Sequence, residues 1–162
     1  MAIFMKCTNI QGESTTEGFK DWTEILSFQF GVGRAIASAN GTSTRESSLA
    51  NLSEVSITKA ADATSVKYFQ QALCGKLDHV VEIRMVRVGA GAPQTFMGYK
   101  LEGVGVSSHS VSASGGPGVD SRPTESITLN FDKITMEYSP IGDDLTGSAS
   151  RYMWDLALSK GG

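Results

Sequence analysis

The stretch ESITLNFDKITMEY, residues 125–138, decides the fold class that we expect for this chain. Two apolar triplets alternate with polar residues along it: Ile127, Leu129 and Phe131, then Ile134, Met136 and Tyr138. Successive side chains on a strand point to opposite faces, so each triplet predicts one buried face of β-structure. Because the first triplet falls on odd and the second on even numbers, one extra residue at Asp132–Lys133 indicates a β-bulge or a bend. A long strand that exchanges its buried face midway suits a closed or sharply curved sheet.

Length and composition favour a globular, mainly β protein. The 162 residues are 40% apolar and 19% charged, and this length predicts a single domain over residues 1–162. The net charge of −3 argues against a nucleic-acid binder, which needs a basic face. No run of about 18 apolar residues is present, so we expect no membrane span and no membrane partner. The N-terminal residues also lack the pattern of a Sec-type signal peptide.

Alternation elsewhere in the chain predicts about eight strands in all. Besides residues 125–138, the segments are Ile3–Thr8, Trp22–Val32, Leu52–Lys59, Asp78–Val88, Thr95–Val106, Ser107–Ser114 and Arg151–Leu158. One amphipathic helix is predicted over Asp62–Gly75, with Gly75 in a left-handed conformation at its end. Its apolar stripe consists of Val66, Phe69, Ala72 and Leu73. We expect this stripe to cover one open side of a barrel.

The residues that could carry chemistry predict no catalytic, cofactor or metal site. Cys7 and Cys74 are expected to be free thiols, with Cys7 in the core. His79 and His109 have no second histidine or cysteine at ligand spacing, so we interpret both as structural. No G-x-S-x-G elbow, dinucleotide-binding loop or P-loop occurs in the chain.

Small uncharged groups occupy the polar face of the segment Trp22–Val32. Its apolar positions are Leu26, Phe28, Phe30 and Val32, and the positions between them include Ser27, Gln29 and Gly31. Such a face is neither a core nor a catalytic pocket, so we expect a smooth, hydrated surface. The segment Ser38–Ser48 is polar and long for a hairpin loop, which is typical of a functional or mobile loop.

Five segments make the chain similar to a known family. They are IQGES (Ile10–Ser14), SFQFGVG (Ser27–Gly33), VKYFQQAL (Val66–Leu73), SRPTESITLNFDKITMEY (Ser121–Tyr138) and RYMWDL (Arg151–Leu156). In this order, over essentially the whole chain, they resemble the Hcp family, the haemolysin-coregulated tube proteins of bacterial type VI secretion systems. The chain has Val66 where many relatives carry Pro at the first helical position.

The resemblance implies a small closed β-barrel of about eight strands with one flanking α-helix, similar to phage tail tubes. Six copies are implied to close into a homo-hexameric ring, and rings to stack into an inner tube. A contractile sheath is implied to fire this tube, which a VgrG spike caps, and small effector proteins to travel in the lumen. The protein is implied to be cytoplasmic before firing, then secreted by the apparatus without a signal peptide, and to have no enzymatic activity.

The resemblance also implies roles for three groups of residues. The lumen is implied for Ser27, Gln29 and Gly31, whose alternative is an ordinary solvent face. The ring-stacking loop is implied for Thr42, Ser43, Thr44, Arg45, Glu46 and Ser47, whose alternative is a disordered hairpin loop. A loop at a subunit contact is implied for Gly116, Pro117, Asp120 and Arg122.

Two other functions stay open on the sequence. One is a small hydrolase on the same scaffold, because the members of a Ser–His–Asp triad need not be close in sequence. The other is a monomeric module that binds sugar or peptide through exposed aromatic residues. Trp22 and Trp154 are the candidates for such a module, and we expect both to face the core instead.

Overall fold

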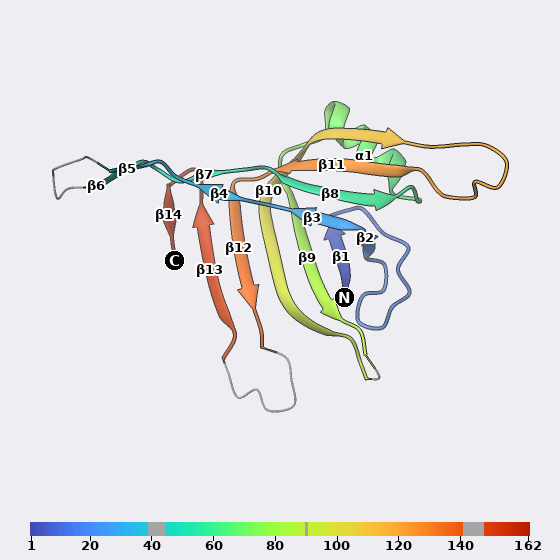
Figure 1. Ribbon diagram of the computed structural model, residues 1–162, viewed down its shortest axis with the longest axis horizontal. Helices are drawn as coiled ribbons and strands as arrows, with labels where there is room; N and C mark the ends of the chain where they lie inside the picture. The colour runs from blue at the N-terminus through green and yellow to red at the C-terminus, as the bar shows by residue number, and fades with distance from the viewer. Residues whose placement is uncertain (39–44, 90, 141–147) are drawn as a thin grey trace.

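The computed structural model describes residues 1–38, 45–89, 91–140 and 148–162, which contain one helix and fourteen strands (Figure 1). The helix is α1 (Ser65–Cys74). The strands are β1 (Ala2–Cys7), β2 (Thr23–Ile25), β3 (Ser27–Gln29), β4 (Val32–Gly33), β5 (Ile36–Ser38), β6 (Arg45–Ser47), β7 (Asn51–Leu52), β8 (Val55–Ala60), β9 (His79–Arg87), β10 (Gln94–Ser112), β11 (Thr124–Asn130), β12 (Lys133–Tyr138), β13 (Ser150–Asp155) and β14 (Lys160–Gly161).

The longest strand, β10, turns a corner that the rest of the sheet follows. Its first part pairs with β9 and β12, and its last part pairs with β11. The corner lies at Gly103, whose φ of 64° favours glycine. The strands β11 and β12 follow the same corner, because the N–H of Asp132 between them donates to the carbonyl of Glu102 at 2.9 Å. The extra residue in the stretch 125–138 therefore lies at a bend between β11 and β12.

The strands form an open ten-stranded sheet and two small two-stranded sheets, so the expected closed barrel of about eight strands is wrong. The main order is β14-β13-β12-β10-β11-β8-β3, with β9 pairing to β10 and β1, and β1 to β2. The small sheets pair β4 with β7 and β5 with β6. In a closed barrel, the segment Trp22–Val32 would join the two edges of the sheet as one strand. It bends at Leu26 instead, so β2 pairs with β1 whereas β3 pairs with β8. This division keeps the hydrogen-bonded ladder open and raises the number of strands.

Two projections extend from opposite ends of the molecule in Figure 1. One is the arm that carries β5 and β6, and the other is the long connection between β10 and β11. The connection between β10 and β11 starts from two strands of the curved sheet, whereas the arm is joined to that sheet through the β4–β7 pair.

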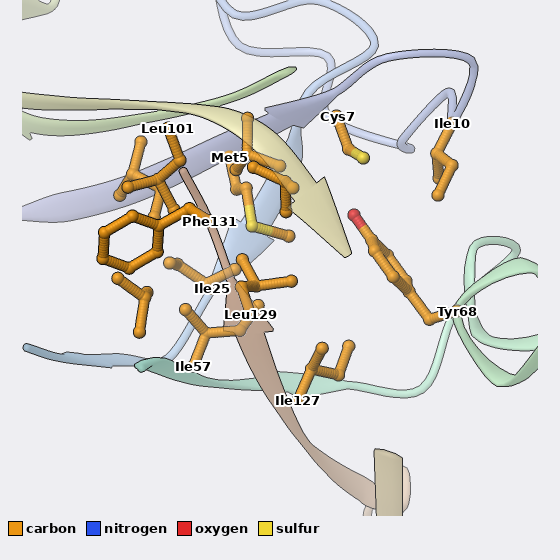
Figure 2. Packing of buried hydrophobic residues seen from close by; sticks show 14 of the residues in the cluster. Met5, Cys7, Ile10, Ile25, Ile57, Tyr68, Leu101, Ile127, Leu129 and Phe131 are labelled. Atoms are coloured by element: carbon orange, nitrogen blue, oxygen red, sulfur yellow. The ribbon is translucent and has the colours of Figure 1, made fainter. Parts of the chain in front are cut away.

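The main core consists of buried side chains from the curved sheet and α1 (Figure 2). Fully buried members include Met5, Val55, Ile57, Ile83, Leu101, Ile127 and Leu129. The first triplet of the stretch 125–138 is buried as predicted. In the second triplet only Ile134 is buried, because Met136 is 42% and Tyr138 46% exposed.

Tyr68, and not the predicted apolar stripe, fixes α1 to the sheet. Its side chain is 1% exposed, and Figure 2 shows its hydroxyl directed toward Cys7. The stripe residues Val66, Phe69 and Leu73 are 75%, 53% and 70% exposed, so the expectation that they cover the barrel is wrong. Gly75 has a φ of −70°, so the left-handed helix end is wrong as well. No helix in the described part of the chain is long and apolar enough to cross a membrane.

Candidate assembly surfaces

Four neighbouring strands, β3, β8, β11 and the end of β10, share a face without formal charge. The cross-strand registers place Ser27, Thr58, Ser126 and Ser110 in one row, and Gln29, Ser56, Thr128 and Ser108 in the next. We call these eight residues the hydroxyl face. It arises because serine and threonine alternate with core residues along each strand, as at Val55 and Ile57 of β8.

Hydroxyl groups of this face contact each other across the strands. The oxygens of Ser27 and Thr58 are 2.6 Å apart, and those of Ser108 and Thr128 are also hydrogen-bonded. Such cross-strand pairs contribute roughly 0.2–1 kcal/mol each to a sheet. Four of the eight residues thus bond to each other across the strands, and the face as a whole is neutral.

The structure places the three residues predicted for the lumen on or beside the hydroxyl face. Ser27 is half-buried, Gln29 is exposed, and Gly31 is exposed just after β3, where its N–H donates to Ser53 Oγ at 2.9 Å. Leu26 and Val32, predicted on the core side, are 62% and 61% exposed. They leave the alternation because the chain bends at Leu26 and β3 ends before Val32.

Six residues of the hydroxyl face were not singled out from the sequence. They are Ser56, Thr58, Ser108, Ser110, Ser126 and Thr128. The alternation of serine and threonine with apolar residues was a usable signal in β8 and β11. Their assembly into one face depends on strand pairing between distant segments, which the alternation does not specify.

The predicted subunit-contact residues lie together in the exposed connection between β10 and β11 (Figure 1). Gly116 has a φ of 142°, which favours glycine at this turn. Pro117 and Asp120 are exposed. Arg122 lies nearer the sheet, with its Nη1 3.9 Å from Oε2 of Glu13. An exposed ion pair of this kind contributes about 0–1 kcal/mol, so it orients the base of the loop only weakly.

The predicted ring-stacking loop is described only in part. Thr42, Ser43 and Thr44 lie outside the described residues, whereas Arg45, Glu46 and Ser47 form β6, which pairs with β5. The arm is joined to the sheet through β4 and β7, where Val32 pairs with Leu52. Next to this pairing, Ile36 and Leu49 are 49% and 76% exposed, so the base of the arm presents apolar groups to solvent.

A buried network of charged residues lies behind the hydroxyl face. Lys59 and Glu125 are direct partners on β8 and β11, and they are 0% and 1% exposed. The Lys59 Nζ donates to Glu125 at 2.6 Å and to Asp62 at 2.8 Å. Nε2 of His109 lies 2.8 Å from Glu125, and the Ser65 hydroxyl donates to Glu125 at 2.7 Å. Because buried charges must be paired, this network ties three strands to the start of α1.

The network lowers the pKa of both of its carboxyl groups. Burial raises the pKa of Glu125, but hydrogen bonds from Lys59, Ser65 and His109 and the charge of Lys59 outweigh it and leave the pKa below its ordinary value. Burial likewise raises the pKa of Asp62, and hydrogen bonds from Lys59 and Thr64 reverse the effect. Elsewhere in the core, burial raises the pKa of the Cys7 thiol to about 11.

The network brings serine, histidine and carboxylate together, but not in the order of a hydrolase triad. In a triad the histidine accepts the proton of the serine, and the carboxylate orients the histidine. Here the Ser65 hydroxyl and His109 both contact the Glu125 carboxylate, and Lys59 neutralises it. Among the described residues, no three His, Cys, Asp or Glu side chains gather as metal ligands. We interpret the network as structural.

An apolar pocket of about 240 Å³ opens between the base of the arm and the strands β12 and β13. Its walls include Phe30, Val32, Leu52, Met136, Tyr152 and Trp154. Trp154 is therefore half-buried at a pocket wall, whereas Trp22 is half-buried and lies edge-on to Phe19 at 5.2 Å. The pocket continues the inner face of the sheet beyond the core, so part of that face is uncovered in the single chain.

Comparison with known proteins confirms the resemblance. The model of the family described as "Type VI secretion system effector, Hcp" matches residues 4–138. Protein hcp1 of Pseudomonas aeruginosa is 24% identical over 156 residues, which are 95% of this chain and 94% of that protein. The family model includes α1 and the hydroxyl face and ends at the last residue of β12.

Solved structures show the same fold. One, described as the structure of a type six secretion system protein, is 30% identical, has a TM-score of 0.88, and matches over 99% of both chains. The crystal structure of Hcp1 from Salmonella typhimurium is 19% identical, with a TM-score of 0.75 over 99% of this chain and 98% of that one. At this lower identity the second comparison supports the fold alone.

Proposed function

Because this chain belongs to the Hcp family of type VI secretion tube proteins, we propose that it is a structural subunit whose six copies close into a ring. Rings stack into the secretion tube, and the tube carries small effector proteins. The work of the protein is self-assembly, without a chemical step. The VgrG spike and the sheath are its further partners, and the apparatus itself exports it from the cytoplasm.

The hydroxyl face carries this proposal, because its chemistry suits the wall of a channel. It extends over four adjacent strands and contains no charged residue among its eight members. A charged wall would attract some effectors and repel others, and an apolar wall would bind partly unfolded ones. We assign Ser27, Gln29 and Gly31, with the other residues of the hydroxyl face, to the lumen.

The two projections are assigned to contacts between copies. The loop with Gly116, Pro117, Asp120 and Arg122 contacts a neighbouring subunit of the ring. The arm that carries β5 and β6 contacts the next ring of the stack, and residues 42–47 are assigned to this contact. Their positions at opposite ends of the molecule support this division, because one copy can then make both contacts at the same time.

Labelling of the lumen tests the proposed function. In a Cys74→Ser background, Gln29→Cys is treated with a small maleimide and with a bulky maleimide-polyethylene glycol. We expect assembly into rings to slow the bulky reagent much more than the small one. Lys100→Cys is the matched control, because Lys100 lies on the first part of β10, before the corner, where it pairs with Glu82 and forms an ion pair with Glu102. Equal slowing at both positions would reject the lumen assignment, and a strictly monomeric protein at high concentration would reject the ring.

Deletion of residues 42–47 tests the stacking contact separately. The ring should persist in native mass spectrometry, whereas the tubes seen by electron microscopy should shorten or disappear. Tubes of unchanged length would exclude a stacking role for this loop.

A further inference from the structure

Helix α1 presents a mostly exposed apolar ridge, whose Phe69 meets the ring of His109 edge-on with the ring centroids 6.1 Å apart. Val66, Phe69 and Leu73 lie three and four residues apart, so they share one face of the helix. Each is more than half exposed. The helix is held to the sheet by other means, since Tyr68 enters the core and Ser65 and Gln71 bond to Glu125 and His79. The apolar ridge is thus not needed to dock the helix.

The pocket between the arm and β12–β13 is the concave counterpart of this ridge. All of its lining residues are apolar or aromatic, and its volume is about 240 Å³. Pockets for small molecules measure about 300–1,000 Å³, so this pocket suits protruding side chains better than a whole small molecule. Beside it, Met136, Tyr138 and Tyr152 are 42%, 46% and 58% exposed. The pocket and its rim therefore form one uncovered apolar patch.

We propose that the apolar ridge of one copy docks into the apolar pocket of the next copy, which deepens the ring of the proposed function and rests on it. The ridge and the pocket belong to different elements, and in Figure 1 α1 lies over a different part of the sheet from β12 and β13. A two-fold contact of ridge with ridge would leave the pocket open. A head-to-tail contact fills the pocket and exposes a new ridge each time, which is the geometry of a cyclic ring.

The exposed apolar area agrees with a specific contact. A buried aromatic side chain covers about 150–250 Å² and an aliphatic one about 60–120 Å². From the exposed fractions, the ridge and the pocket rim each offer about 250 Å². Because interfaces are roughly 57% apolar, the two patches together correspond to a contact of about 900 Å², close to the lower limit of about 1,000 Å² for a specific interface. The two projections add to this area in a ring.

Single substitutions on each side of the contact test the inference. Leu73→Asp and Met136→Asp should each raise the subunit concentration at which the ring half-dissociates at least tenfold, measured by sedimentation velocity. Leu73→Met keeps the ridge apolar and should assemble normally. Val88→Asp is the matched control, because Val88 is 58% exposed, directly follows β9 and belongs to neither the ridge nor the pocket. Rings of unchanged stability in both Asp variants would overturn the contact and leave the proposed ring standing, whereas a monomeric wild-type protein would overturn both.

Disulfide cross-linking identifies the partner surfaces directly. In the Cys74→Ser background, Leu73→Cys and Met136→Cys are combined in one chain and oxidised. A head-to-tail contact gives a covalent ladder that extends beyond dimers, and neither single variant gives cross-links. A dimer from Leu73→Cys alone would show ridge-to-ridge pairing and overturn the inference, and so would rings that form without any cross-link in the double variant.

Discussion

Replacement of Glu125 by glutamine tests how far the buried network stabilises the fold. The substitution keeps the shape of the side chain but removes the charge that Lys59 meets at 2.6 Å. Removing one partner of a buried pair costs about 3–5 kcal/mol, because the other charge stays buried. Lys59 keeps Asp62 at 2.8 Å and the carbonyl of Ala60 at 2.9 Å, so we expect the lower end, about 3 kcal/mol. For a chain of this size that lowers Tm by roughly 6–12 °C.

Urea unfolding, followed by the fluorescence of Trp22 and Trp154, measures this free energy. All variants are compared at one protein concentration, because assembly stabilises the native state by mass action. Glu24→Gln is the control, since Glu24 is exposed on β2 and its replacement should stay within about 0.5 kcal/mol. The double variant Lys59→Met with Glu125→Leu should recover most of the loss, because an apolar pair often replaces a buried ion pair without cost. A Glu125→Gln protein within about 1 kcal/mol of the wild type would refute the reasoning.

Three further predictions concern acid, glycine geometry and thiol reactivity. The pKa values of Glu125 and Asp62 are lower in the folded protein than their ordinary values of 4.5 and 3.8. Both carboxylates therefore stabilise the fold when the pH is above these ordinary values, and this stability is lost as the pH falls through the lower native pKa values. The urea midpoint should therefore drop below about pH 4.5, and less steeply in Glu125→Gln; parallel curves would contradict this. Gly103→Ala should cost about 1–3 kcal/mol in urea unfolding, because φ is 64° and the new Cβ would overlap the carboxylate of Asp132. Gly33→Ala, which meets no atom within 4 Å, should be neutral, and equal losses would exclude the steric argument. In the native protein a thiol reagent should modify one cysteine at pH 8, the exposed Cys74, because Cys7 is buried with its pKa raised to about 11; two reactive thiols before unfolding would show that the core around Cys7 opens.

The alternation in residues 125–138 predicted the buried positions of β11 and the corner at Asp132, because period-two burial is a local property of the chain. It did not predict that Met136 and Tyr138 stay uncovered. An apolar face that stays exposed in the single chain has the same spacing of apolar residues as one that packs into the core. The apolar ridge of α1 was misassigned for this reason. Tyr68, which does enter the core, carries a polar group and did not belong to the predicted stripe.

The buried network left a signal that sequence reasoning passed over. Lys59 continues the inward series of Val55 and Ile57, and Glu125 begins the inward series of Ile127. Opposite charges at core positions of two strands predict a buried pair when those strands are neighbours. The neighbouring relation of β8 and β11 is a long-range property, so the pair became recognisable only with the fold.

The hydroxyl face has a consequence for any molecule that moves along it. Its side chains are short and neutral, and some of its hydroxyls bond to each other across the strands, so a passing surface meets shallow and similar partners. Each interaction that breaks behind the moving molecule is replaced by an equivalent one ahead, which keeps the free energy nearly level along the path. If this face lines the tube as proposed, transport over it needs no recognition of the cargo and little force to start, because its neutral side chains differ little from one position to the next.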